Sequence, residues 1–289
     1  MGQSTRIDWC DASWNPVTGC LHGCEYCYAR GIANRFGFLK DDGKLHELNK
    51  PCTRDYYEDG EIAQADVKQP YPNSFAPTFH RYRLDEPQRW KKPRTIFVCS
   101  MADLFGDWVP WEWIWAVFEA CDKAPQHRYI FLTKNPKRYM MMYNSRYIRE
   151  MNAKYPDKPM KQTEEYKDVP PLPRRDNWWF GSTLDSMSAK RASLGITDHT
   201  FVSIEPLTER MDVGLGSFGG DEWVIIGAET GNRKGKVIPK KDWVMQIVEA
   251  ASITHMKVFM KESLRGLMGD DFRQEFPWEA NNEDDQADH

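Results

Sequence analysis

The sequence has no long apolar segment. Its 289 residues include no run of about eighteen or more apolar side chains, so no membrane-spanning helix is predicted. Residues 1–8 also lack the basic-then-apolar layout of a secretory signal. We therefore expect a cytoplasmic protein with no membrane partner.

The chain also lacks an excess of positive charge and a paired set of cysteines. Its formal net charge is −4, which argues against a nucleic-acid footprint over the whole surface, although local basic loops stay compatible with one. Seven cysteines are an odd number, unlike a secreted disulfide framework. Three of them, Cys20, Cys24 and Cys27, lie close together and need a chemical explanation.

Short apolar runs alternate with segments of helical period. The runs are typical of buried parallel strands and cover 95–99, 128–132, 177–181, 200–204, 223–227 and 257–260. Helices are predicted at 28–36, 110–121, 136–147, 185–194 and 241–253, and a further strand is expected before Cys20. This alternation predicts an α/β fold with a partial or complete parallel (β/α) barrel, with a doubly wound open sheet as the alternative.

We expect a single domain over residues 1–278. Within it, residues 38–94 are rich in Asp, Gly, Pro and Tyr without clear periodicity, which predicts an irregular insertion or lid. Residues 279–289 are acidic and predict a disordered tail. Ligands of parallel sheets bind beyond the carboxyl ends of the strands, so the residues after each run are candidates for the site.

The three clustered cysteines have the spacing Cys20-x3-Cys24-x2-Cys27. Three soft thiolates on one loop can hold three corners of an iron–sulfur cubane and leave one iron open. A structural zinc site is the alternative, because His22 completes a nominal Cys3His set, although its spacing to Cys24 is tighter than usual. The aromatic Tyr26 directly precedes the third cysteine, where simple core packing is the other interpretation.

This loop resembles the signature of the radical S-adenosylmethionine (SAM) superfamily. The longer string WNPVTGCLHGCEYCYAR further resembles a phage-type radical SAM family. The resemblance implies a radical SAM barrel in which Cys20, Cys24 and Cys27 ligate a [4Fe–4S] cluster and SAM binds the open iron. It also implies one-electron cleavage of SAM to a 5′-deoxyadenosyl radical, with flavodoxin or ferredoxin as the reductant, in bacterial or infected-host cytoplasm.

Several strand ends carry candidate cofactor-binding residues. After the first run, Ser100 and Asp103 stand where the superfamily usually has a Gly-Gly-Glu motif for the SAM amino group, and the sequence departs from that motif. Asp103 could equally cap the turn before Phe105. Ser182 is a candidate for the SAM ribose or carboxylate, or for a helix cap.

Two later strand ends add carboxylates and lysines. Glu205 lies just before Pro206 and is the strongest single carboxylate, while Gly227 and Glu229 belong to a loop that can approach the adenine. Lys134 and Lys261 follow other runs and could meet an anionic group, or be solvated. Glu205, Lys134 and Lys261 are the catalytic candidates.

The substrate expectation comes from the resemblance and from local basic loops at 91–94, 134–138 and 233–236. Phage members of such families are associated with thymidine hypermodification. This implies isomerisation of an amino-acid-modified thymidine in DNA from nitrogen to carbon attachment, on a base flipped from the helix. The alternatives are a DNA-repair lyase, a peptide-modifying enzyme, and a non-catalytic zinc-stabilised module that binds nucleic acid.

Overall fold

The computed structural model describes residues 5, 7–37, 39–58, 61–161, 163–186, 189, 198–211, 218 and 220–279, with the backbone alone at 53–58 and 61–68. The chain divides into two compact units, Met1–Phe180 and Gly181–His289. Within the described ranges, no helix is long and apolar enough to cross a membrane. The predicted tail 279–289 lies outside the described residues except for its first residue, and so does most of the helix predicted at 185–194.

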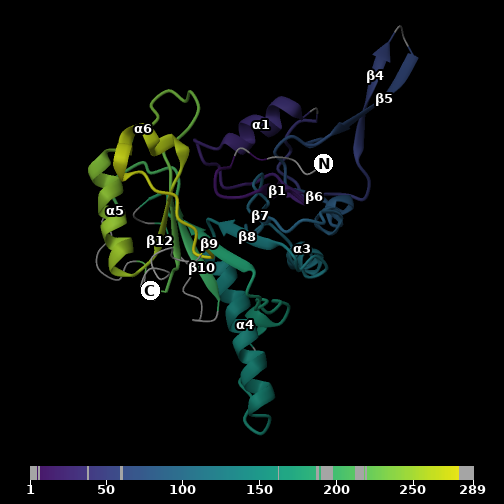
Figure 1. Ribbon diagram of the computed structural model, residues 1–289. Helices are drawn as coiled ribbons and strands as arrows, with labels where there is room; N and C mark the ends of the chain where they lie inside the picture. Colours follow the sequence, from purple (N-terminus) through teal and green to yellow (C-terminus); the bar gives the residue numbers. More distant parts are fainter. Residues whose placement is uncertain are drawn as a thin grey trace. The chain divides into compact units, whose positions relative to one another are not determined.

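The first unit is built on parallel strands. β1 (Ala12–Trp14) pairs with β7 (Thr95–Val98), which pairs with β8 (Arg128–Thr133), all in parallel. β9 (Trp178–Thr183) begins in this unit. The helices α1 (Tyr28–Phe36), α3 (Trp111–Asp122) and α4 (Pro136–Lys154) belong to the same unit, and α4 is the longest of them (Figure 1).

Aromatic side chains fill the core of the first unit. Phe131 of β8 stacks on Phe180 of β9 at 5.3 Å between ring centroids, and Phe118 of α3 meets Phe131 edge-on at the same distance. Such stacked and edge-to-face pairs add about 0.5–1.5 kcal/mol each to the gain from burial alone. The helix stripe expected within 110–121 therefore packs onto the sheet, as its spacing predicts.

The second unit repeats the same construction. β10 (His199–Ile204), β11 (Trp223–Ile226) and β12 (Lys257–Met260) pair in parallel, and α5 (Lys241–Ile253) precedes β12. Every residue of β11 is buried, which explains why these strands read as continuous apolar runs. The chain then continues through η3 (Glu262–Leu264), α6 (Arg265–Met268) and η4 (Gly269–Asp271).

The strands form one sheet in the order β1-β7-β8-β9-β10-β11-β12. All six predicted runs are strands, and the helices predicted at 28–36 and 241–253 have the predicted bounds. The order never reverses, whereas a doubly wound sheet needs a reversal, so that alternative is wrong. The α/β class with a parallel sheet is confirmed, and the strand order is compatible with a partial barrel.

The expectation of an irregular segment over 38–94 is wrong in part. β3 (His46–Leu48) and β6 (Thr78–His80) form a small sheet with β2 (Val17–Thr18), and β4 (Cys52–Glu58) pairs with β5 (Glu61–Gln69) as an antiparallel hairpin. η1 (Arg81–Arg83) and α2 (Glu86–Arg89) follow. Strands of two or three residues are too short to show alternation, so their pairing could not be inferred from the sequence.

A buried histidine joins two strands of the small sheet. His80 is fully buried; its Nε2 lies 2.9 Å from Oγ1 of Thr18, and its Nδ1 lies 3.3 Å from the hydroxyl of Tyr82. Burial, together with the charge of Arg83, lowers the pKa of His80 from its ordinary value of 6.5 to about 2. The folded protein therefore holds this imidazole neutral, whereas the unfolded chain protonates it in mild acid.

This difference predicts a loss of stability in acid that His80 causes. Because its folded pKa is depressed, its contribution is complete above pH 6.5 and declines as the pH falls towards the folded value of about 2. Below pH 6.5 the free energy of unfolding of the wild type should fall by up to about 1.4 kcal/mol per pH unit more than that of His80→Gln. Urea titrations of both proteins between about pH 7 and pH 4.5 measure this. If the free energies of unfolding of the two proteins changed equally with pH, His80 would not be the cause of the loss of stability in acid.

Candidate functional site

The cysteine loop starts at a glycine pressed against neighbouring backbone. The amide of Gly19 donates to the carbonyl of Met101 at 2.9 Å, and the amide of Cys20 donates to the carbonyl of Phe75 at 3.2 Å. Gly19 has φ +85°, and a Cβ placed there would lie 2.3 Å from the carbonyl oxygen of Ala76. Only glycine fits this position, which fixes where the loop leaves the end of β2.

The third cysteine begins a helix. Cys27 is the N-cap of α1, and its Sγ accepts a hydrogen bond from the amide of Arg30 at 3.4 Å. Cys20 and Cys27 both pack against one buried apolar cluster, formed by Ala29, Ala33, Phe75 and Met101. Cys27 therefore joins the start of α1 to the apolar cluster, and its sulfur is one of three soft donors on the loop.

The three thiols affect one another electrostatically. Burial, with smaller contributions from negative charge on Asp103, Cys24 and Cys27, raises the pKa of Cys20 to about 12. None of the seven cysteines forms a disulfide bond. Three neighbouring thiolates repel each other unless a cation lies between them, and an iron–sulfur cluster or zinc supplies that positive charge.

The side chains do not form a ready-made metal site. Across the described ranges, no three His, Cys, Asp or Glu side chains are placed so that they could hold one metal ion. The donor set nevertheless fits a cluster chemically, because it offers three partly exposed soft thiols on one short loop. Binding would require the thiols to turn towards a common point.

A buried carboxylate ties the loop to the strand ends. Asp103 lies after β7 and is 6% exposed. It accepts hydrogen bonds from the Thr133 hydroxyl at 2.7 Å, from the Lys134 amide at 2.9 Å and from the Phe105 amide at 2.9 Å. Nε2 of His22 lies 2.7 Å from its Oδ2. The loop residue between Cys20 and Cys24 is therefore held by the ends of β7 and β8.

Further contacts tie the loop at other points. The ammonium of Lys134 donates to the hydroxyl of Tyr26 at 2.7 Å, and the hydroxyl of Tyr28 donates to the carbonyl of Ser100 at 2.9 Å. Oδ1 of Asn15 accepts from Oγ of Ser100 at 3.2 Å and from the amide of Met101 at 2.9 Å. The structure thus brings together the predicted residues Tyr26, Ser100 and Lys134 around the loop.

These contacts bear on the roles predicted for Ser100 and Asp103. The carboxylate of Asp103 already accepts from four groups, including the amide of Phe105. This arrangement matches the capping alternative and leaves the carboxylate little remaining acceptor capacity. Contacts of Ser100 and Asp103 with SAM stay predictions. The sequence did not single out Asn15 or Thr133, although Asn15 lies in the string that carries the resemblance.

In the second unit, three strand ends meet. Lys261, after β12, forms a hydrogen-bonded ion pair with Glu205, after β10. Gly227, after β11, lies between them: a Cβ there would be 2.9 Å from Cδ of Lys261 and 3.2 Å from Cγ of Glu205. The structure therefore brings together three predicted site residues. Lys261 has Glu205 as an ionic partner and is not simply solvated.

Glu229 and Ser182 differ from the sequence expectation. The buried carboxylate of Glu229 accepts two hydrogen bonds from Arg233, at 2.6 and 2.7 Å, so a local ion pair satisfies it. Ser182 was expected after a strand, but β9 continues to Thr183, so Ser182 is a buried strand residue. Apolar periodicity ends at Gly181, and it gave no sign that polar residues would extend the strand.

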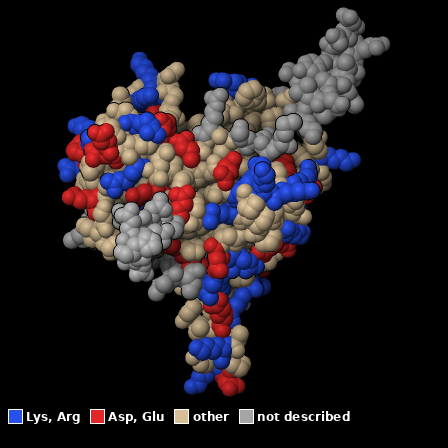
Figure 2. Space-filling view, in the orientation of Figure 1, with Lys and Arg blue, Asp and Glu red and all other residues tan. Residues whose placement is uncertain are grey.

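The basic loops are partly used inside the fold. Arg138 is buried, lies 3.5 Å above the ring of Trp111 and donates to the carbonyl of Val109. Arg233 pairs with Glu229. Figure 2 shows Lys and Arg interspersed with Asp and Glu over the described residues of the face in view. These observations weaken the argument from basic loops for nucleic-acid binding.

Replacing Gly19 should disturb the loop much more than replacing Gly23. Both glycines have positive φ, but a Cβ at Gly23 would meet no atom within 4 Å. Gly23→Ala should cost about 1–2 kcal/mol in free energy of unfolding, from backbone strain alone. Gly19→Ala adds a backbone clash and should cost about 2–5 kcal/mol. Chemical denaturation measures both, and equal costs would contradict the close approach.

Removing the charge of Asp103 should destabilise the fold. Asp103→Asn replaces one acceptor oxygen by an amide that cannot accept, so a buried donor loses its partner and the protein loses about 1–3 kcal/mol. Asp107→Asn is the matched control, because Asp107 is exposed and accepts from Asn135 at 2.8 Å. It should change stability by less than about 0.5 kcal/mol. Urea unfolding compares the two variants. An Asp103→Asn variant as stable as the wild type would refute the stabilising role of the hydrogen bonds to Asp103.

Two comparisons with known proteins found nothing, and one found a family. No curated protein and no solved structure matches the chain. A family model described as "Protein of unknown function (DUF5131)" matches residues 4–266, which is most of the sequence. The chain therefore belongs to the DUF5131 family.

Proposed function

We propose that this protein is a radical SAM enzyme in which Cys20, Cys24 and Cys27 hold a [4Fe–4S] cluster. The observation that carries the proposal is the loop itself, on which three thiols outside any disulfide lie between the end of β2 and the start of α1. Three thiolates leave one iron for SAM. The carboxyl ends of parallel strands are also where ligands of such sheets bind.

The bound cluster and SAM would supply one-electron chemistry that generates a radical able to remove hydrogen from a substrate. The residues of the chain position and shield the loop. Asp103 fixes His22, and Lys134 fixes Tyr26, so two points between the cysteines are tied to strand ends. The apolar cluster under Cys20 and Cys27 excludes water from one side of the loop.

The substrate that the resemblance implies is an amino-acid-modified thymidine in DNA, isomerised without a change of mass. Glu205, Lys134 and Lys261 are the proposed groups for acid–base or anion contacts, with Gly227 leaving room beside the ion pair. A flavodoxin or ferredoxin is the proposed electron donor. A mass-neutral product would favour the isomerase, release of repaired thymines a lyase, and an altered peptide a peptide-modifying enzyme.

A zinc-stabilised nucleic-acid-binding module is the second candidate, and one contact favours it. A metal-bound histidine usually donates its other ring nitrogen to a carboxylate, and His22 is held by Asp103 in that manner. Nδ1 of His22 would then join the three thiols as the fourth ligand. This module would bind metal without performing redox chemistry.

Anaerobic reconstitution with iron and sulfide, followed by electron paramagnetic resonance of the reduced protein, distinguishes these functions. The wild type should give a cubane signal that changes when SAM is added, because SAM binds the open iron. Cys24→Ala should lose the signal, whereas Cys10→Ala, which changes a cysteine outside the loop, should keep it.

The opposite result is also clear. One tightly bound zinc per chain, with no cluster formed under these conditions, would refute the radical enzyme and support the binding module. A cluster signal that ignores SAM would refute the open-iron site even though the cysteines bind iron.

A further inference from the structure

The first unit contains a cavity of about 550 Å³. It is lined by residues of β1, of the hairpin base and of η1 and α2: Ser13, Asn15, Pro51, Gln69, Pro70, Tyr71, Tyr82, Arg83, Glu86 and Arg89. Eight of these ten lie in the segment 38–94 that the sequence marked as an insertion. Pockets of roughly 300–1,000 Å³ hold small organic ligands, so the cavity is far larger than an inorganic ion needs.

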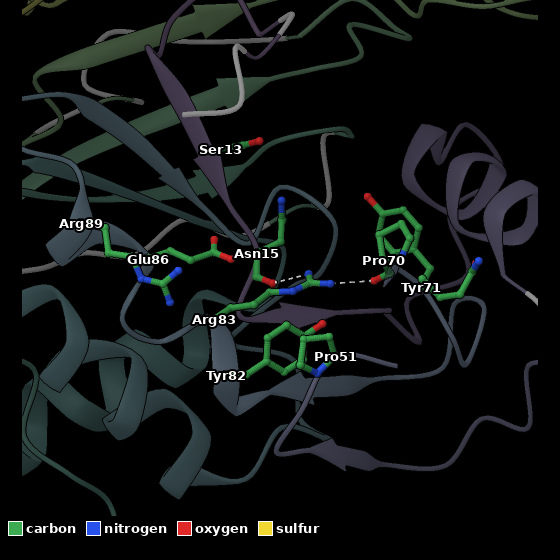
Figure 3. Close-up of a pocket in the computed structure, with 10 residues that line it drawn as sticks. Ser13, Asn15, Pro51, Pro70, Tyr71, Tyr82, Arg83, Glu86 and Arg89 are labelled. Carbon is green, nitrogen blue, oxygen red and sulfur yellow. Dashed lines mark hydrogen bonds between the residues drawn. The ribbon is translucent and has the colours of Figure 1, made fainter. Parts of the chain in front are cut away.

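One arginine in this cavity is fixed before any ligand arrives. Arg83 donates to the carbonyl of Asn15 at 2.9 Å and to the carbonyl of Pro70 at 2.8 Å, as the dashed lines in Figure 3 show. A guanidinium has five N–H donors, so others stay available to an anion. Since its position is already set, a ligand would not have to order this side chain.

Flat rings and neutral polar groups complete the lining. The rings of Tyr71 and Tyr82 present aromatic surface, and Pro51 and Pro70 add apolar walls (Figure 3). Within the described part of the chain, Nδ2 of Asn15 and the hydroxyl of Tyr71 have no hydrogen-bond partner. Rings suit a planar heterocycle by stacking, and the polar groups suit its edge or a sugar.

The charges of the lining favour an anion. Arg83 and Arg89 carry positive charge against the single carboxylate Glu86. Arg89 pairs with Asp85, but both side chains are more than half exposed, so this ion pair contributes little and can be exchanged. His80 contacts the hydroxyl of Tyr82. Its imidazole is neutral in the fold, so it does not repel the positive charge of Arg83. An anionic group would pair with the N–H donors of Arg83 that the two backbone carbonyls leave available.

The cavity also adjoins the supports of the cysteine loop. Asn15, whose side chain holds Ser100 and the amide of Met101, lines it directly. Tyr71 both lines the cavity and packs on the apolar cluster that Cys20 and Cys27 contact. A ligand in this cavity would therefore lie beside groups that position the loop.

We propose that this cavity binds a nucleotide, with its base against Tyr71 and Tyr82 and its phosphate at Arg83 and Arg89. The inference deepens the proposed function by locating a binding site for the nucleotide, and it rests on that function only for the claim that the bound nucleotide reacts. The nucleotide is either free or one unit of a nucleic-acid strand, since both present the same base and phosphate.

Isothermal titration calorimetry of the full chain with thymidine 5′-monophosphate tests the binding site, first without added iron. The nucleotide should bind, whereas thymidine and inorganic phosphate should each bind at least about tenfold more weakly. Tyr71→Ala and Arg89→Glu should each weaken the nucleotide by about tenfold or more. Tyr155→Ala and Arg265→Glu are matched controls on exposed residues and should bind like the wild type.

Further measurements distinguish a free nucleotide from a nucleic-acid strand and keep the test decisive if one variant does not fold. A short single-stranded oligonucleotide that binds more tightly than the monophosphate identifies nucleic acid, and the reverse order identifies a free nucleotide. If Tyr71→Ala does not fold, Arg89→Glu still decides, because Arg89 is exposed. Absence of binding by both probes, or unchanged binding in a folded pocket variant, would overturn the proposal. Cluster formation is measured separately, so the pocket and the radical enzyme can fail independently.

Discussion

One buried carboxylate supports the arrangement of the first unit's strand ends. Asp103 is almost inaccessible to water, and a charge in such a place is stable only when donors surround it. Its donors come from the turn after β7, from the end of β8 and from the cysteine loop. Three separate segments of the chain therefore donate hydrogen bonds to the same buried carboxylate. The position of the loop follows from satisfying that charge, in addition to the apolar packing beneath it.

Much of the fold could be predicted because its strands are buried on both faces. Continuous apolar runs gave all six later strands, and helical periodicity gave α1 and α5 with their bounds. The segment 38–94 could not be predicted in the same way, since strands of two or three residues depend on distant partners that periodicity does not reveal. The end of β9 was misplaced for a related reason, because Ser182 is polar but still pairs within the sheet.

In the candidate site, too, features set by neighbouring residues could be predicted from the sequence, whereas contacts between distant residues could not. Cysteine spacing is local, so the loop was visible in the sequence, and strand ends marked Glu205 and Lys261 one at a time. Their pairing across two strands, and the presence of Gly227 between them, needed the sheet register. His22 is another example: its place among the three cysteines suggested a zinc ligand, although its spacing to Cys24 is tighter than usual, whereas its hydrogen bond to Asp103 depends on a residue far along the chain.

The cap at Cys27 joins secondary structure to sulfur chemistry. The same Sγ accepts the amide of Arg30 at the first turn of α1 and belongs to the cysteine trio. Hydrogen bonds to sulfur tune the reduction potential of iron–sulfur clusters. Oxidation or alkylation of this one atom would therefore fray the helix start as well as remove a thiol, so chemical damage at Cys27 would be detectable as a change in backbone amide exchange along α1.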